Sequence, residues 1–340
     1  MFSEAITGLI PSREQWQSHF PGLMACVTVA MAAAFLSEQY HGPTMLFALL
    51  LGMAFNFSTQ SNGPAVPGIG YASKTVLRFG IALLGLRISF AEISDLGFAP
   101  VVLVIATVLS TILVGLLLAR VLGMANNFGV LTGGAVAICG ASAAMAISAV
   151  MRKGENHERD TLFTVVSVTA LSTLAMILYP IVVKYFQLDD TMAGIFIGAS
   201  IHDVAQVVGA GYTISDQTGD VATLVKLMRV AMLAPLVFLF ALTLGDKTAG
   251  KSGPPALPMF LVAFIVLMLA NNLLPIPAFI VEQLVILSRW CLVTAIVAIG
   301  MKTSLGQLAE VGGKAILLIV LETLFLAALV LLVSKHWLNF

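Results

Sequence analysis

The sequence contains very little charge. Only 10% of its 340 residues are Asp, Glu, Lys or Arg, whereas 59% are hydrophobic. A soluble domain carries about 25% charged residues because its surface faces water. A chain with so few charges cannot cover a water-facing surface. The composition therefore excludes a soluble globular protein and predicts an integral membrane protein that contacts the lipid bilayer.

Other signals are also absent. The 17 basic and 17 acidic residues give a formal net charge of zero, which leaves no basic surface for nucleic acid. The three cysteines, Cys26, Cys139 and Cys291, lie in apolar runs and lack the spacing of a disulfide framework or a metal site. We therefore expect no metal and no cofactor. Residues 1–20 are expected to form a polar N-terminal segment that lacks the shape of a cleavable signal.

Long apolar runs fill the rest of the chain. A helix needs about 20 apolar residues to cross a hydrocarbon core of about 30 Å. Such runs occur near residues 21–38, 43–57, 71–90, 99–122, 128–151, 160–185, 191–212, 219–244, 257–273, 279–302 and 313–334. They are continuous, unlike the alternating strands of a membrane barrel. The sequence predicts an all-α polytopic membrane protein with about 11 transmembrane helices, in one transmembrane domain at residues 21–338.

The densest basic loop, MRKGENHERD, occupies residues 151–160. Basic loops favour the cytoplasmic side of a membrane. Counting the expected helices from this loop places the N-terminus outside the cell and the C-terminus inside.

Two halves of the sequence resemble each other. GLRISFAEISDLG at 85–97 matches GMKTSLGQLAEVG at 300–312 without a gap. The same offset relates Pro43 to Pro258 and Asn56 to Asn271, so the repeat spans residues 43–97 and 258–312. The number of helices between the halves gives them opposite directions. Inverted repeats are typical of secondary transporters, although a duplication retained only for packing is also compatible with the pattern.

Glycine and small residues are concentrated in a central core at residues 128–212. LTGGAVAICGASAAMAISAV and GASIHDVAQVVGAGYT share the triplet Gly-Ala-Ser, at Gly140–Ala141–Ser142 and at Gly198–Ala199–Ser200. One interpretation is close packing of membrane helices. The other is a pair of discontinuous helices, whose free N–H groups could bind an anion. On the second interpretation Gly140, Ala141, Ser142, Gly198 and Ser200 contact the substrate.

Ionisable residues within expected helices are candidates for function because their burial in lipid is costly. His202 and Gln206 are four residues apart and are expected to share a helix face, with Asp203 beside them. We predict that His202 and Gln206 contact substrate and that His202 and Asp203 carry coupling protons. A fixed polar pair that joins two helices is the alternative.

Further charged residues are harder to interpret. Lys226 and Arg229 lie three residues apart, so they either extend to the interface or line a path for an anion. Arg78 and Glu322 need partners that the sequence does not identify. Arg87 is expected to anchor a helix end at the interface.

LTGGAVAICGASAAMAISAV, GLRISFAEI, GASIHDVAQVVGAGY and ATLVKLMRV resemble the signature stretches of the YeiH-type sulfate exporter family of bacterial inner-membrane proteins. The resemblance runs from about residue 20 to the end of the chain. It implies a transporter related to cation/proton antiporters and bile-acid symporters, with crossed broken helices and a mobile core that slides against a scaffold. Sodium/proton exchange is in doubt because no Asp-Asp pair lies in an expected helix. Asp189 and Asp190 are expected in a loop.

The leading prediction is a secondary active transporter that exports sulfate or another small sulfur oxyanion or sulfonate across the bacterial inner membrane, with coupling to protons. A homodimer is left open. A passive anion channel is an alternative. An intramembrane hydrolase is disfavoured, since Ser200 and His202 would point in different directions on a regular helix. We therefore do not expect an enzyme.

Overall fold

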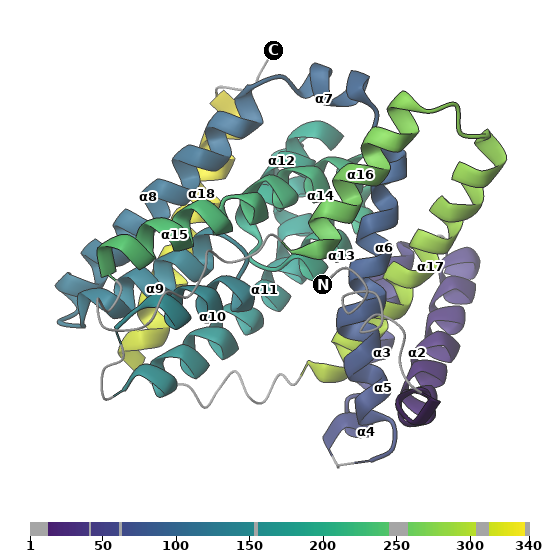
Figure 1. The fold of residues 1–340 in the computed structure, drawn as a ribbon, viewed down its shortest axis with the longest axis horizontal. Coiled ribbons are helices and arrows are strands. Elements are labelled where there is room, and N and C mark those ends of the chain that lie inside the picture. Colours follow the sequence, from purple (N-terminus) through teal and green to yellow (C-terminus); the bar gives the residue numbers. More distant parts are fainter. Residues whose placement is uncertain are drawn as a thin grey trace. The chain divides into compact units, whose positions relative to one another are not determined.

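The computed structural model of the chain describes residues 13–40, 42–60, 63–152, 156–244, 258–303 and 313–336. Within these ranges the chain forms helices and no strand (Figure 1), which confirms the all-α prediction. Two parts of the predictions lie outside the described residues: residues 1–12 of the expected polar segment and residues 304–312 of the second repeat half.

The chain divides into two compact units. The first comprises Met1–Leu84 and Pro277–Ser304. Its helices are α2 (Arg13–Tyr40), α3 (Thr44–Ala54), α4 (Phe57–Gln60), α5 (Val66–Tyr71), the π-helical turn η1 (Ala72–Val76), α6 (Leu77–Leu84) and α17 (Ala278–Lys302). Helix α2 already begins at Arg13, inside the segment that was expected to be polar and separate. Helices α5, η1 and α6 follow one another without a loop.

The second unit comprises Gly85–Ile276 and Leu305–Phe340. It begins with the 3₁₀ turn η2 (Gly85–Arg87), followed by α7 (Phe90–Leu96), α8 (Ala99–Val121), α9 (Asn126–Ala137), α10 (Ala141–Val150) and α11 (His157–Phe186). The chain continues with α12 (Asp190–Ser200), α13 (Val204–Ile214), α14 (Asp216–Ala231), α15 (Leu233–Leu244), α16 (Met259–Leu273) and α18 (Gly313–His336). Every candidate substrate or proton site residue named above belongs to this unit.

Seven spans in the described part of the chain are long and apolar enough to cross a membrane, by length and composition. Four shorter apolar helices accompany them, at Thr44–Ala54, Ala141–Val150, Val204–Ile214 and Met259–Leu273. The protein is therefore a multi-pass membrane protein. The predicted number of about eleven crossings stays a prediction.

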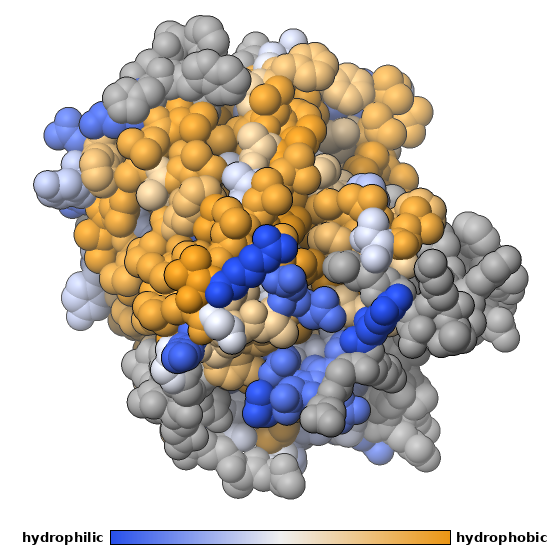
Figure 2. Space-filling model, turned by 90° about the vertical axis from the view of Figure 1, so that its left-hand side faces the viewer, coloured by the Kyte–Doolittle hydropathy of each residue, from blue (hydrophilic) through white to orange (hydrophobic). Residues whose placement is uncertain are grey.

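Helix α8 shows how the surface is built. Leu109, Leu113 and Leu117 recur every four residues and are 47%, 59% and 56% exposed. The opposite face of the helix, which includes Thr111 and Gly115, is buried. Figure 2 shows hydrophobic residues over most of the upper part of one face, with hydrophilic residues in its centre and lower part and at its left edge. An exposed apolar stripe of this kind is the surface that a lipid-facing helix requires.

The sequence repeat corresponds to contacts that occur twice. In the first unit, Asn56 Nδ2 donates to the carbonyl oxygen of Met301 at 2.7 Å. In the second unit, Asn271 Nδ2 donates to the carbonyl oxygen of Leu86 at 2.8 Å. The two asparagines are matched positions of the repeat, and the two acceptors are matched in the same way. The same contact therefore forms twice. In one case the asparagine belongs to the first half of the repeat and the acceptor to the second, and in the other case the reverse holds.

The glycines of the repeat make equivalent close approaches. A Cβ atom at Gly300 would collide with the carbonyl oxygen of Leu49, and one at Gly85 would collide with that of Phe264. These glycines and their neighbours are again matched by the repeat offset. Pro43 and Pro258 both precede the first residue of a helix. The matched residues therefore have the same local roles in both halves.

Candidate functional site

Two helices of the second unit are interrupted. Helix α9 ends at Ala137 and α10 begins at Ala141, while α12 ends at Ser200 and α13 begins at Val204 (Figure 1). At the first break Gly140 has φ 62° and ψ −123°, a conformation that side chains disfavour. The second break contains no glycine, and its residues Ile201 and Asp203 are extended.

The two breaks are in contact. A Cβ atom placed on Gly140 would lie 3.6 Å from the Cβ of His202 and 3.8 Å from its carbonyl carbon. His202 lies between two helices and not on one, so the expectation that His202 and Gln206 share a helix face is wrong. The sequence Ile201–His202–Asp203 leaves the helical conformation and resumes it only at Val204.

Lys226 joins the breaks. This residue of α14 is fully buried, and its Nζ donates to the carbonyl oxygens of Ile138 at 2.7 Å and Ile201 at 2.9 Å. Those two carbonyls follow the last residues of α9 and α12. The ends of a helix carry unpaired carbonyl groups and a partial negative charge. A single ammonium therefore stabilises two helix C-termini, and it retains a third N–H.

Arg229 performs the same function one turn further along α14. Its Nε donates to Ala137 O at 2.8 Å, and its Nη2 donates to Val136 O at 2.8 Å and to Ala137 O. Its Nη1 donates to Ala199 O at 2.7 Å and to Ile201 O at 3.2 Å. Both cations are fully buried, so neither extends to the membrane interface. In the described part of the chain neither forms a salt bridge.

The half-helices that start at the breaks leave their first N–H groups without intrahelical partners. No side chain caps α10 or α13, and the first intrahelical bonds are Ala144 N to Gly140 O and Val207 N to Asp203 O. Ser142, in the first turn of α10, is exposed, and Asp203 is half-buried. Donors at the start of a helix favour an anion.

The side chain of His202 is buried and held by α18. His202 Nε2 lies 3.0 Å from Thr323 Oγ1, and Thr323 donates its own hydrogen to the carbonyl oxygen of Ile319. The shared hydrogen therefore belongs to His202 Nε2. The Nδ1 atom of the ring is buried without a hydrogen-bond partner among the described residues. It is left as an acceptor when the ring is neutral.

Gln206 is held in the same way by α11. Its Nε2 donates to Thr173 Oγ1 at 3.4 Å, and Thr173 donates to Thr169 O. Gln206 Oε1 is buried and has no partner in the described part of the chain. Nearby, the hydroxyl of Ser172 accepts from Asp203 N at 3.0 Å. Buried polar atoms are nearly always paired, so His202 Nδ1 and Gln206 Oε1 are the candidate ligand-contacting atoms beside the breaks.

Gly198 and Ser200 occupy different surroundings. A Cβ atom at Gly198 would collide with the carbonyl oxygen of Ala222, and one at Gly194 with Val221, so these glycines allow α12 to pack closely on α14. Ser200 is buried and donates to the carbonyl oxygen of Phe196 at 2.5 Å. The structure thus brings Gly140, His202, Lys226 and Arg229 together, and it places Gly198 and Ser200 within a packed helix.

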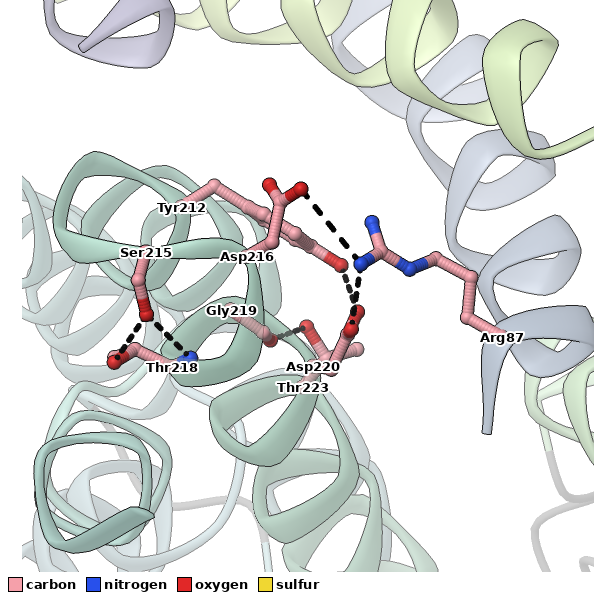
Figure 3. Close-up of polar contacts among 8 residues, drawn as sticks. All are labelled: Arg87, Tyr212, Ser215, Asp216, Thr218, Gly219, Asp220 and Thr223. Carbon is pink, nitrogen blue, oxygen red and sulfur yellow. Dashed lines mark hydrogen bonds and ion pairs between the residues drawn. The ribbon is translucent and has the colours of Figure 1, made fainter. Parts of the chain in front are cut away.

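A second polar cluster lies where α13 meets α14 (Figure 3). Arg87 Nη2 lies 2.9 Å from Asp220 Oδ2 and 3.8 Å from Asp216 Oδ2. Tyr212 donates to Asp220 Oδ1 at 2.5 Å, and the guanidinium of Arg87 lies 5.9 Å from the centre of the tyrosine ring. Arg87 was expected to be a simple anchor. Its acidic partners were missed because Asp216 and Asp220 lie far from it in the sequence.

The comparisons with known proteins agree on one family. A sequence model of the family described as "Conserved hypothetical protein 698" matches residues 21–339. The chain belongs to this family. Its relatives carry the name UPF0324 membrane protein, and the resemblance to YeiH-type proteins is confirmed at this level.

Several UPF0324 membrane proteins match nearly the whole chain. One from Chlorobaculum tepidum is 53% identical over 93% of this chain and 89% of the relative. The UPF0324 membrane protein TauZ of Paracoccus denitrificans is 50% identical over 96% of this chain and 97% of the relative. Among solved structures, the sodium proton antiporter MjNhaP1 from Methanocaldococcus jannaschii matches with 14% identity and a TM-score of 0.30, over 95% of this chain and 100% of that chain.

Proposed function

We propose that this UPF0324 protein is a secondary active transporter that moves a small anion, such as sulfate or another sulfur oxyanion or sulfonate, across the bacterial inner membrane. One observation carries the proposal. Two interrupted helices of a membrane protein meet at their breaks, with buried cations and uncapped N–H groups around the meeting point. Irregular backbone at membrane depth is tolerated where it lies in protein or lines a cavity.

The charges around the breaks support an anion. Lys226 and Arg229 contribute two positive charges, and Asp203 is close enough to Lys226 for an electrostatic interaction between them. The balance of these three groups is one positive charge. The positive dipole ends of α10 and α13 offset the negative ends of α9 and α12, so the side-chain charge is not cancelled by the helix dipoles. An anion bound there would receive backbone hydrogen bonds and would neutralise the remaining charge.

Proton coupling through His202 and Asp203 is part of the proposal. The neighbouring cations Lys226 and Arg229 oppose a positive charge on the His202 ring, so in this proposal the ring takes its proton only with an anion beside it. The ring is fixed by Thr323. A proton at Nδ1 and an anion at the adjacent helix start would attract each other, so the binding of one would raise the affinity for the other. Direct contact of the anion with His202 and Gln206 is the corresponding proposal for substrate binding.

The proposed transport cycle is alternating access. The contacts that recur in both halves of the sequence support the repeat. In this proposal its halves run in opposite directions, which is the usual architecture of secondary transporters. In this cycle the unit that contains both breaks moves as a body, and the site opens to each side in turn. Passive conduction is the alternative outcome.

The described residues offer no support for an intramembrane hydrolase. Ser200 donates its hydroxyl hydrogen to Phe196 O, and a serine nucleophile needs a base at hydrogen-bond distance. We therefore propose transport without catalysis.

The test is a flux measurement with a designed variant. Val204 is the first residue of α13, and Asp203 before it has φ −104° and ψ 145°, the conformation that favours a following proline. Val204→Pro therefore removes one N–H from the site without opposing the helix. Loss of a hydrogen bond to a charged group costs about 1.5–3 kcal/mol, which is about tenfold or more in affinity.

The assay uses the full chain in proteoliposomes with radiolabelled sulfate, and thermal shift with sulfate, sulfite, thiosulfate and taurine as probes. Met259→Pro is the matched control, since Met259 is exposed and begins α16 after an extended Pro258. The proposal predicts saturable flux that Val204→Pro lowers and Met259→Pro leaves unchanged. Equal flux in both variants, or single-channel currents, would contradict it.

A further inference from the structure

Glu322 is a buried acid near the middle of α18. Its side chain has no exposed surface, and the span Gly313–Lys335 that contains it is otherwise strongly apolar. An ionisable residue inside a membrane span is costly and usually serves a function. Neither the binding site proposed above nor the close packing of the glycine-rich helices accounts for it.

The carboxyl group fits a small pocket between α8 and α9. Glu322 Oε1 lies 2.8 Å from Thr132 Oγ1 of α9. A Cβ atom placed on Gly115 of α8 would lie 2.5 Å from the same oxygen and 2.8 Å from the carbonyl oxygen of Gly129, so glycine at position 115 lets both the acid and α9 approach α8 closely. Glu322 Oε2 is buried without a hydrogen-bond partner among the described residues.

No cation compensates this acid within the described part of the chain. Helix α18 packs on α8, α9, α11 and α12, and Glu322 forms no salt bridge there. The charged and titratable side chains of those helices have other surroundings. Arg120 hydrogen-bonds Asn126, Asp190 bonds Thr218, His157 bonds Ser148, and the ring of Tyr179 contacts the tilted ring of Phe196. The remaining ones lie in the first and last turns of α11: Glu158, Arg159, Asp160, Lys184 and Tyr185. Thr323, the residue that follows Glu322 on α18, contacts His202.

The hydroxyl of Thr132 can serve both protonation states of the acid. Thr132 Oγ1 also lies 3.1 Å from the carbonyl oxygen of Phe128. With a neutral acid, Glu322 donates its proton to Thr132, whose own hydrogen goes to Phe128 O. With a carboxylate, Thr132 turns its hydrogen toward Glu322 Oε1. Rotation of one hydroxyl therefore accommodates gain and loss of a proton.

We propose that Glu322 is a proton-binding site of this protein, protonated when it lies in the Gly115–Thr132 pocket, and that its proton couples to transport. The pocket connects to the breaks through neighbouring residues. Glu322 bonds α9, whose C-terminus Lys226 and Arg229 stabilise, and the next residue, Thr323, holds His202. Release of the proton leaves an unpaired charge in the pocket, which favours a conformation in which the acid reaches water. The coupling role rests on the proposed transport function, whereas the proton site itself does not.

The proton site is tested by infrared spectroscopy of the purified full chain in nanodiscs. A protonated carboxylic acid has a carbonyl stretching band that a carboxylate lacks. The wild-type protein should show a band that persists at neutral pH, disappears in Glu322→Gln and shifts in Thr132→Val. Glu158→Gln is the matched control, because Glu158 is an exposed acid of α11, and this substitution should leave the neutral-pH band unchanged. A neutral-pH band that Glu322→Gln leaves unchanged, or no such band in the wild type, would overturn the proposal.

The coupling role is tested by flux of radiolabelled sulfate with the membrane potential clamped. Exchange or cotransport of one proton per anion supports up to about tenfold accumulation for each unit of pH gradient. In Glu322→Gln this accumulation should fall to the level without a gradient, while sulfate binding by thermal shift is retained. Gradient-driven accumulation that survives in Glu322→Gln would refute the coupling role. If the wild-type protein neither bound nor transported sulfate, the proposed function would be refuted. The proton site would still be tested by the infrared result alone.

Discussion

Lys226 Nζ lies 2.7 Å from the carbonyl oxygen of Ile138 and donates to it across 88 residues of sequence. The same ammonium donates to Ile201 O, so a single side chain bridges the ends of α9 and α12. Two helix C-termini directed at one point would repel each other through their partial negative charges. The bridge explains why a fully buried lysine is stable in a membrane domain.

Removal of this bridge should destabilise the protein. In Lys226→Met the buried carbonyl of Ile138 loses its side-chain donor, whereas Ile201 O keeps Arg229 Nη1. One unsatisfied buried group costs about 1–3 kcal/mol. Thermal unfolding in detergent measures the effect as a lower Tm. Lys314→Met is the control, since Lys314 is exposed at the start of α18, and an equal Tm for both variants would contradict the bridging role.

Gly140 should resist substitution because of its backbone. Its φ of 62° with ψ of −123° is costly for any residue with a side chain, by about 1–3 kcal/mol. Gly140→Ala should therefore lower the Tm. Gly70→Ala is the control, because Gly70 lies in α5 with open space around its Cα, and alanine favours a helix. Equal Tm values for the two variants would contradict the positive φ of Gly140 at the first break.

The cluster around Arg87 makes a separate prediction. A Cβ atom at Gly219 would lie 2.5 Å from the ring of Tyr212, so Gly219→Ala must displace the tyrosine from Asp220. Tyr212→Phe removes only the hydrogen bond and should cost about 1 kcal/mol. Gly219→Ala should cost more. Chemical or thermal unfolding distinguishes them, and the reverse order would show that the ring does not pack on Gly219.

The duplicated asparagine contacts make a paired prediction. Asn56→Ala and Asn271→Ala each remove one hydrogen bond to a backbone carbonyl, at about 1 kcal/mol each. The two bonds lie in different units, so the double variant should show the sum of the two effects. A large effect of one substitution with none of the other would argue that the repeat does not preserve equivalent roles.

The sequence predicts the all-α fold and two interrupted helices, but it does not show which residues interrupt them. The glycine-rich stretches indicate broken helices, but of the glycines in the first stretch Gly133 and Gly134 lie inside α9, and Gly140 is at the break. At the second break Gly198 is within α12, and the interruption occurs at His202, which has no helix-breaking character of its own. Both positions depend on packing against α11, α14 and α18, which a local pattern does not contain.

The partners of the buried ionisable residues could not be predicted for a related reason. Lys226 and Arg229 bind backbone carbonyls, which every residue possesses, so no residue type in the sequence marks those acceptors. Thr132 lies 190 residues from Glu322. Threonines such as Thr132, Thr173 and Thr323 are ordinary in membrane helices, and only the fold brings them to Glu322, Gln206 and His202.

The central claim is that an anion binds where the breaks meet. The most direct measurement is a cryo-EM structure of the full chain in nanodiscs with saturating selenate, an electron-dense sulfate analogue. The account predicts density at the first N–H groups of α10 or α13, within contact distance of His202 or Lys226. It would be contradicted if selenate were transported but occupied a different part of the protein, with the meeting point of the two breaks closed and empty.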